Sequence, residues 1–122
     1  MAIQKRNSAA VNLLSNDLVR NQGELHLSIA NVTTTPYAAG ANTVLLCATG
    51  AGNILVNLPQ VSANLGKVYV INKRDVGAGQ VVVTPFAGDN INGAGSRNVV
   101  NQWDTIIIVA GATTAWYVIS TV

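Results

Sequence analysis

The residues that commonly carry out catalysis are few in this sequence, and they do not cluster. Nucleophilic catalysis requires a nucleophile together with a base that activates it. The single histidine, His26, alternates with Leu25 and Leu27, and we interpret it as a surface or edge-strand residue. The single cysteine, Cys47, lies in an apolar run and is interpreted as an inert buried thiol. The sequence therefore predicts no catalytic residue and no enzyme activity.

The acidic residues do not have the spacing of a metal site or of a catalytic pair. Residues 89–93 (Asp-Asn-Ile-Asn-Gly) are similar to the start of a calcium loop, but Ile91 stands where an oxygen ligand is needed. Residues 93–98 begin like a dinucleotide fingerprint and lack its third glycine. A glycosidase needs two paired carboxylates, whereas the acids after residue 24 fall at turn-like positions, namely Asp75, Asp89 and Asp104. We expect no metal ion and no cofactor. The alternatives are a calcium site at residues 89–93 and a glycosidase site with a pair of catalytic carboxylates.

Aromatic residues are the remaining candidates for a small-molecule site, because a sugar-binding platform is built from them. Tyr69 and Trp116 lie within apolar runs, so we expect both in the core with a polar tip satisfied. A carbohydrate-binding module is therefore an alternative that requires exposed aromatic side chains. The aromatic residues are Tyr37, Tyr69, Phe86, Trp103, Trp116 and Tyr117.

The chain has an unusually low charge for a folded domain. Hydrophobic residues make up 49% of its 122 residues and charged residues only 10%, against roughly a quarter in typical domains. A surface with so few charges favours association, so we expect a subunit of a larger assembly. The net charge of +2 comes from scattered basic residues, which argues against nucleic-acid binding. The longest purely apolar run, 106–110, is too short to cross a bilayer, and residues 1–6 are not followed by the apolar region of a secretion signal.

Residues 25–122 have the pattern of one all-β domain. Apolar and β-branched runs recur about every ten residues, and Gly, Asn, Asp and Pro separate them. We interpret the paired glycines at 50 and 52 and at 77 and 79 as hairpin connections, with no internal repeat. The pattern predicts an antiparallel β-sandwich of jelly-roll-like topology. The expected strands are 25–30, 44–47, 54–58, 68–71, 81–84, 90–92, 98–100, 103–109 and 115–122.

Residues 1–24 differ from the rest and predict an N-terminal arm. Val11, Leu14 and Leu18 have helical spacing, and Leu13 and Val19 lie beside them, but four asparagines disfavour an isolated helix. We expect the arm to become ordered against a partner. The alternative is that it packs on its own sandwich. The predicted partner-binding residues are Lys5, Arg6, Val11, Leu14, Leu18 and Arg20.

The order of several short motifs between residues 43 and 119 resembles a β-rich module of bacteriophage tail fibres, head fibres and virion decoration proteins. The motifs are Leu58-Pro59, the strand that begins at Gly66-Lys67, Val83-Thr84-Pro85, Gly88 to Gly93 and the final Trp116-Tyr117-Val118-Ile119. The resemblance covers about two-thirds of the chain and does not include residues 1–24.

The resemblance implies a non-catalytic virion protein that forms a homotrimer. Together with the small size and the low charge, it predicts a head decoration (cement) protein that binds the major capsid protein on the outer surface of the particle. The alternative is a fibre or receptor-binding module. A virion protein would be made in the host cytoplasm, and we expect neither a nucleic-acid nor a membrane partner.

Overall fold

The computed structural model describes residues 25–122. The predicted arm, residues 1–24, lies outside the described residues. So do its predicted partner-binding residues Lys5, Arg6, Val11, Leu14, Leu18 and Arg20.

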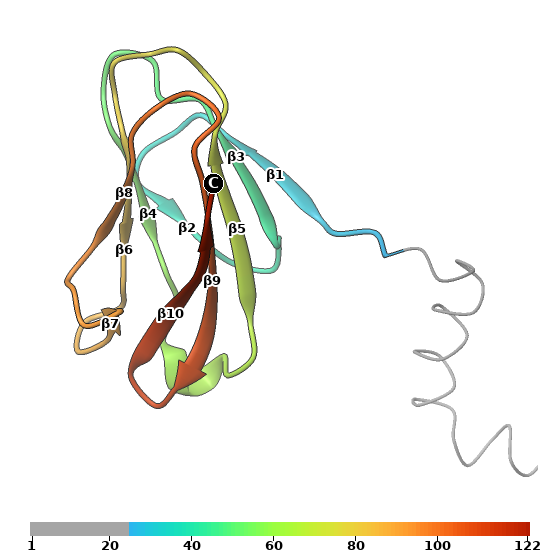
Figure 1. The fold of residues 1–122 in the computed structure, drawn as a ribbon, viewed down its shortest axis with the longest axis vertical. Helices are drawn as coiled ribbons and strands as arrows, with labels where there is room; N and C mark the ends of the chain where they lie inside the picture. The colour runs from blue at the N-terminus through green and yellow to red at the C-terminus, as the bar shows by residue number, and fades with distance from the viewer. Residues whose placement is uncertain (1–24) are drawn as a thin grey trace, which may run out of the picture.

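The described chain forms two β-sheets that face each other, so the predicted two-layer β arrangement is present (Figure 1). The six-stranded sheet contains β1 (Ile29–Val32), β3 (Val44–Cys47), β5 (Val68–Lys73), β9 (Thr105–Ala112), β10 (Ala115–Thr121) and β7 (Asn90–Ile91), in that order. The four-stranded sheet contains β2 (Tyr37–Ala38), β4 (Ile54–Asn57), β6 (Val81–Thr84) and β8 (Arg97–Val99). A short 3₁₀ helix, η1 (Val61–Ala63), follows β4. Residues 25–122 contain no helix that is long and apolar enough to span a membrane.

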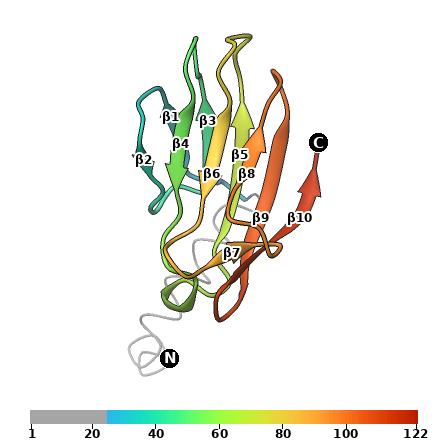
Figure 2. The ribbon, with the colours of Figure 1, turned by 90° about the vertical axis from the view of Figure 1, so that its left-hand side faces the viewer.

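The chain alternates between the two sheets for its first six strands. β1, β3 and β5 pair in parallel in one sheet, and β2, β4 and β6 pair in parallel in the other. The segments 48–53 and 74–80 are therefore arches that cross from one sheet to the other, and they lie side by side at one end of the molecule (Figure 2). β8, β9 and β10 then close the structure with antiparallel pairings.

This winding corrects the predicted antiparallel hairpins and jelly-roll-like order. In a jelly roll the neighbouring strands run antiparallel. Here β1, β3 and β5 pair in parallel in one sheet, and β2, β4 and β6 pair in parallel in the other. The chain also contains an internal repeat that the sequence analysis missed. Gly-Ala-Gly-Asn-Ile at 50–54 and Gly-Ala-Gly-Gln-Val at 77–81 precede strands in register, with Ile54 opposite Val81.

The core lies between the two sheets and is built from alternate residues of each strand. Tyr69 and Trp116 are both completely buried, which confirms their predicted place in the core. The expected satisfied polar tip is found for Tyr69 and not for Trp116, whose Nε1–H has no hydrogen-bond partner among the described residues. Their ring centroids lie 5.6 Å apart, and the Tyr69 hydroxyl donates to the Gly40 carbonyl at 2.8 Å. Cys47 is also completely buried, as predicted. Burial of each large apolar side chain contributes roughly 1.5–3 kcal/mol to the free energy of folding.

The first predicted strand begins later than expected. Residues 25–28 precede β1 without belonging to it, and Leu25 is 76% exposed. In β1 itself Val32 points into the core and Ile29 points outward. The predicted strand 25–30 had placed Leu25, Leu27 and Ile29 on one inward face, so that assignment was wrong.

Candidate interaction surfaces

The outer face of the six-stranded sheet is largely apolar, apart from one row in which Asn31, Asn72 and Thr105 accompany Leu46. Leu45, Tyr69, Ile71, Ile106 and Ile108 point into the core. Because side chains alternate along a strand, the residues between them point outward. We call this surface the apolar face, and it consists of Ile29, Val44, Leu46, Val68, Val70, Ile107, Val109 and Tyr117.

The strand register places these side chains in rows across the sheet. Ile29, Val44, Val70 and Ile107 are successive partners on β1, β3, β5 and β9. A second row joins Val68 to Val109 and Val109 to Tyr117, at the other end of β5. Ile29 and Tyr117, at the two margins, are 56% and 44% exposed. A continuous surface of this kind on the described domain is typical of an interaction site.

The outer face of the four-stranded sheet is more polar. Its outward positions include the exposed Asn57 and Asn98 and the half-buried Thr84, next to Leu55 and Val82. On the six-stranded sheet the polar outward residues of β1, β3, β5 and β9 are confined to the end of the face, at Asn31, Asn72 and Thr105. The two faces therefore differ in chemistry, and the apolar face is the better candidate for contact with another protein.

Asp75, supported by the buried Lys73, joins the two arches. The Lys73 side chain is 1% exposed, and its Nζ donates to the carbonyls of Asp75 at 2.6 Å and Gly77 at 2.8 Å. The Asp75 carboxylate accepts from Lys73 Nζ at 3.1 Å, from the Gly50 N–H at 2.9 Å and from the Thr49 N–H at 3.0 Å. The hydrogen bond from the Gly50 N–H, with the bonds from Thr49 and Lys73, holds the pKa of Asp75 well below its usual range. The sequence analysis missed this cluster because a lysine is usually exposed.

The carboxylates considered as catalytic or metal-binding groups each accept a hydrogen bond from a different backbone N–H group. Asp89 accepts from the Val61 N–H at 2.9 Å, and Asp104 accepts from the Asn101 N–H at 3.0 Å. Val61 is 28 residues from Asp89 in the sequence, so this carboxylate ties two distant segments together. In the segment considered as a calcium loop, Asn90 Oδ1 accepts from the Gly93 N–H at 2.9 Å. Within residues 25–122, no three His, Cys, Asp or Glu side chains lie close enough to hold a metal ion.

Phe86, Trp103 and Tyr117 are the exposed aromatic residues of the described domain, and the last two lie at different ends of the six-stranded sheet. The Trp103 N–H donates to the Lys73 carbonyl at the end of β5, whereas Tyr117 is aligned through Val109 with Val68 at its start. Five residues of strand separate these ends by about 16 Å. Trp103 is 64% exposed and has a φ of 73°, a strained conformation for a residue with a side chain. Trp103 and Tyr117 therefore do not form one sugar platform.

No protein-family model matches the chain, and no curated protein matches its sequence. The function is therefore inferred from the surfaces of the domain and from the motif order.

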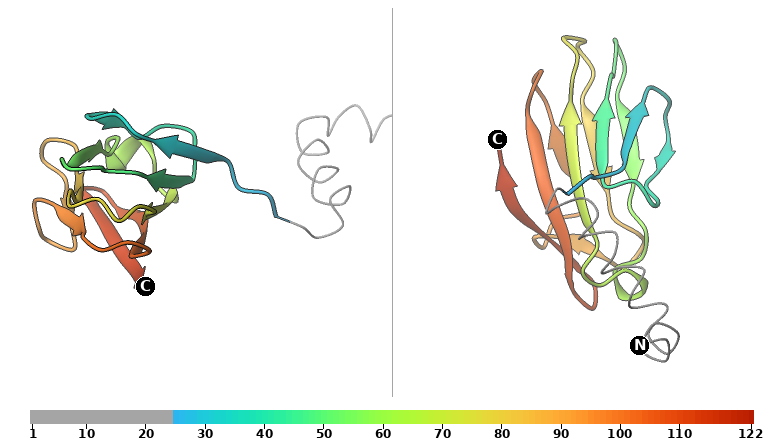
Figure 3. Two further views of the ribbon diagram at one scale, coloured as in Figure 1. Left: turned by 90° about the horizontal axis from the view of Figure 1, so that it is seen from above. Right: turned by 90° about the vertical axis from the view of Figure 1, so that its right-hand side faces the viewer.

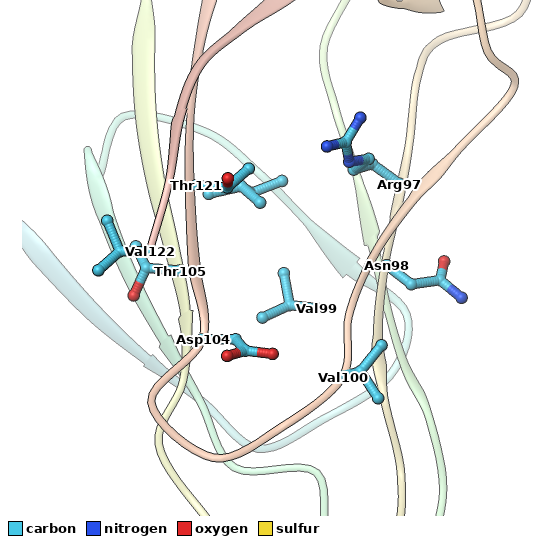
Figure 4. A pocket seen from close by; sticks show the side chains of 9 residues that line it. Arg97, Asn98, Val99, Val100, Asp104, Thr105, Thr121 and Val122 are labelled. Atoms are coloured by element: carbon cyan, nitrogen blue, oxygen red, sulfur yellow. The ribbon is translucent and has the colours of Figure 1, made fainter.

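A groove of about 310 Å³ opens at the edge of the sandwich (Figure 4). It lies between β8, which ends the four-stranded sheet, and the segments where β9 begins and β10 ends. We call it the edge groove. It is lined by Arg97, Val99, Val100, Asp104, Ile106 and Val122, among others.

Proposed function

We propose that this chain is a non-catalytic structural protein of a bacteriophage particle, a head decoration protein that binds the major capsid protein through its apolar face. The observation that carries the proposal is the row Ile29–Val44–Val70–Ile107, an uncharged apolar surface that spans four strands. Burying such a surface releases water from it and favours association by roughly 25 cal/mol for each Å² of apolar area.

The order of the strand and turn motifs supports the choice of a virion protein, and the low charge of the chain supports assembly. In this proposal the protein is a homotrimer on the outer surface of the particle, and residues 1–24 add a second contact with the shell. Neither nucleic acid nor membrane takes part. Analytical ultracentrifugation of the trimer is expected to give a molecular mass three times the 12.7 kDa of the chain.

A fibre or receptor-binding module is the second candidate. The exposed, strained Trp103 at one end of the domain favours it, because exposed aromatic residues on end loops are frequent contact anchors. Immunogold electron microscopy of the source particle separates the two functions. Label spread over the capsid shell supports decoration, and label confined to a fibre tip supports the second candidate.

A lysine placed on the apolar face tests the docking surface. Val70 lies on a central strand of the six-stranded sheet and Val82 on a central strand of the other sheet, and both are half-buried and point outward. Val70→Lys is expected to reduce binding to undecorated particles at least tenfold, because a charge would be buried without a partner. Val82→Lys is the matched control and should bind as the wild type does. Equal binding by the two variants would exclude the apolar face as the docking surface.

A further inference from the structure

The edge groove has an unpaired strand edge along one side. β8 pairs with β6 and ends the four-stranded sheet, so its other edge carries no strand in the described domain. Half of the N–H and C=O groups of such a strand point outward and can pair with an added strand. In Figure 4 the Val99 side chain lies between Arg97 and Asn98, which are also on β8, and Thr121 and Val122 at the end of β10.

Apolar and polar side chains both line the edge groove, and its charged residues are Arg97 and Asp104. Val99 and Ile106 are 2% and 4% exposed, and Val100 at the margin is 44% exposed. The Arg97 side chain lines the groove and has no hydrogen-bond or ion-pair partner among residues 25–122. An extended segment with alternate apolar side chains and a neighbouring acid fits these features.

Residues 25–28 are a segment of that description. They lead away from the body before β1 (Figures 1 and 3), and Leu25 and Leu27 are 76% and 45% exposed. Leucines two residues apart on an extended chain point to the same side. In the sequence Glu24 directly precedes Leu25, which supplies an acid to complement Arg97.

The segment cannot reach the edge groove of its own chain. Ser28 is held at β3, because its carbonyl accepts from the N–H groups of Thr43 and Val44. From β1 to β10 there are four strand spacings, or about 19 Å. Four extended residues span at most about 14 Å, and they lead away from the sheet. Residues 25–28 can therefore occupy an edge groove only in another molecule.

We propose that residues 25–27 of one copy of this chain lie in the edge groove of a second copy and add a short strand to β8. Leu25 and Leu27 pack on the exposed Val100 and Val122 at the margin of the groove, and Glu24 pairs with Arg97. The contact joins two different surfaces, so repeating it produces a closed ring or a filament. The inference rests on the proposed function for its premise that the protein assembles, and it names the contact between copies.

Disulfide trapping between two single variants tests this contact. Leu27→Cys and Val100→Cys chains are mixed at full length and oxidised. Cys47 does not interfere, because burial raises the pKa of its thiol to about 12. We expect a covalent dimer in the mixture and none beyond background in either variant alone. The double variant should give covalent rings of three.

The matched control replaces Leu65, an exposed leucine outside residues 25–28. A Leu65→Cys chain mixed with Val100→Cys should give no dimer above background. If Leu27→Cys gives no more dimer than Leu65→Cys, the contact is wrong. It is also wrong if Val100→Cys is trapped instead by a Ser15→Cys chain, which would place residues 1–24 in the groove.

The result is independent of the docking test on the apolar face. Loss of particle binding in Val70→Lys without trapping at Val100 would overturn this inference and leave the proposed function standing. Trapping at Val100 in a protein that does not bind particles would overturn the proposed function and leave the contact between copies standing.

Discussion

The Lys73 ammonium group lies 3.1 Å from the Asp75 carboxylate inside the junction of the two arches. The lysine side chain is 1% exposed and that of Asp75 is 25% exposed, so the pair is shielded from water on the lysine side. The carboxylate also accepts hydrogen bonds from the Thr49 and Gly50 N–H groups of the other arch. Asp75, which Lys73 holds in place, therefore fixes the spacing between its own arch (74–80) and the arch at 48–53.

Replacing Asp75 is expected to destabilise the domain strongly. Asp75→Ala leaves the Lys73 charge buried without its partner and removes the acceptor of both arch N–H groups. We expect the free energy of unfolding to fall by about 3 kcal/mol. Urea denaturation measures it. Asp104→Ala is the control, because that carboxylate accepts one backbone N–H in an exposed loop and its loss should cost about 1 kcal/mol. Equal effects would contradict the role of the arch junction.

The stability of the domain should fall in acid because of the same carboxylate. The hydrogen bond from Gly50, with those from Thr49 and Lys73, lowers the pKa of Asp75 below its ordinary value of 3.8. An acid with a lowered folded pKa stabilises the fold above its unfolded pKa, and this contribution is lost as the pH falls through the folded pKa. We expect the melting temperature to drop below about pH 4. Asp75→Asn should melt lower at pH 7 and lose less on acidification, and a parallel drop in both proteins would count against this assignment.

A methyl group on Gly79 should separate the arches. A Cβ at this position would collide with the Gly52 carbonyl of the other arch, and the Gly79 N–H donates to the Gly50 carbonyl at 3.0 Å. Gly79→Ala is expected to lower the free energy of unfolding by about 2 kcal/mol, because the backbone must move to make room. Gly52→Ala is the matched control, since a Cβ there would meet no atom within 4 Å. Thermal melting compares them, and similar melting temperatures would show that the arches are not in contact.

The positions of most strands follow from the sequence. The runs 44–47 and 81–84 match β3 and β6, and the runs around Tyr69 and Trp116 correctly predicted two core side chains. Local alternation and turn residues suffice for this, because a strand needs only extended backbone and side chains that suit it. The two-residue strand β2 was missed, since Tyr37 and Ala38 are too few to show a pattern.

The direction of the strands was decided by tertiary structure. Gly50 and Gly52 permit either a hairpin or an arch, and the choice depends on whether β3 pairs with β4 or with β5. That pairing joins Leu45 to Ile71, 26 residues further along the chain. The repeat of Gly-Ala-Gly at 50 and 77 was the available sequence signal for parallel turns.

The candidate surfaces also depend on the tertiary structure. Val44-Leu45-Leu46-Cys47 is apolar at every position, which is typical of a strand covered on both faces, so the sequence alone does not reveal that the Val44 and Leu46 side is left open. The edge groove requires the end of one sheet to lie beside the other sheet. Lys73 is charged and would be expected in water, and it is buried because its own arch folds the carbonyls of Asp75 and Gly77 and the Asp75 carboxylate around its Nζ. Only the tertiary structure brings the Thr49 and Gly50 N–H groups of the other arch to that carboxylate. The sequence thus determined the alternation and composition of the strands, whereas long-range pairing decided which side chains were covered and which were left to meet a partner.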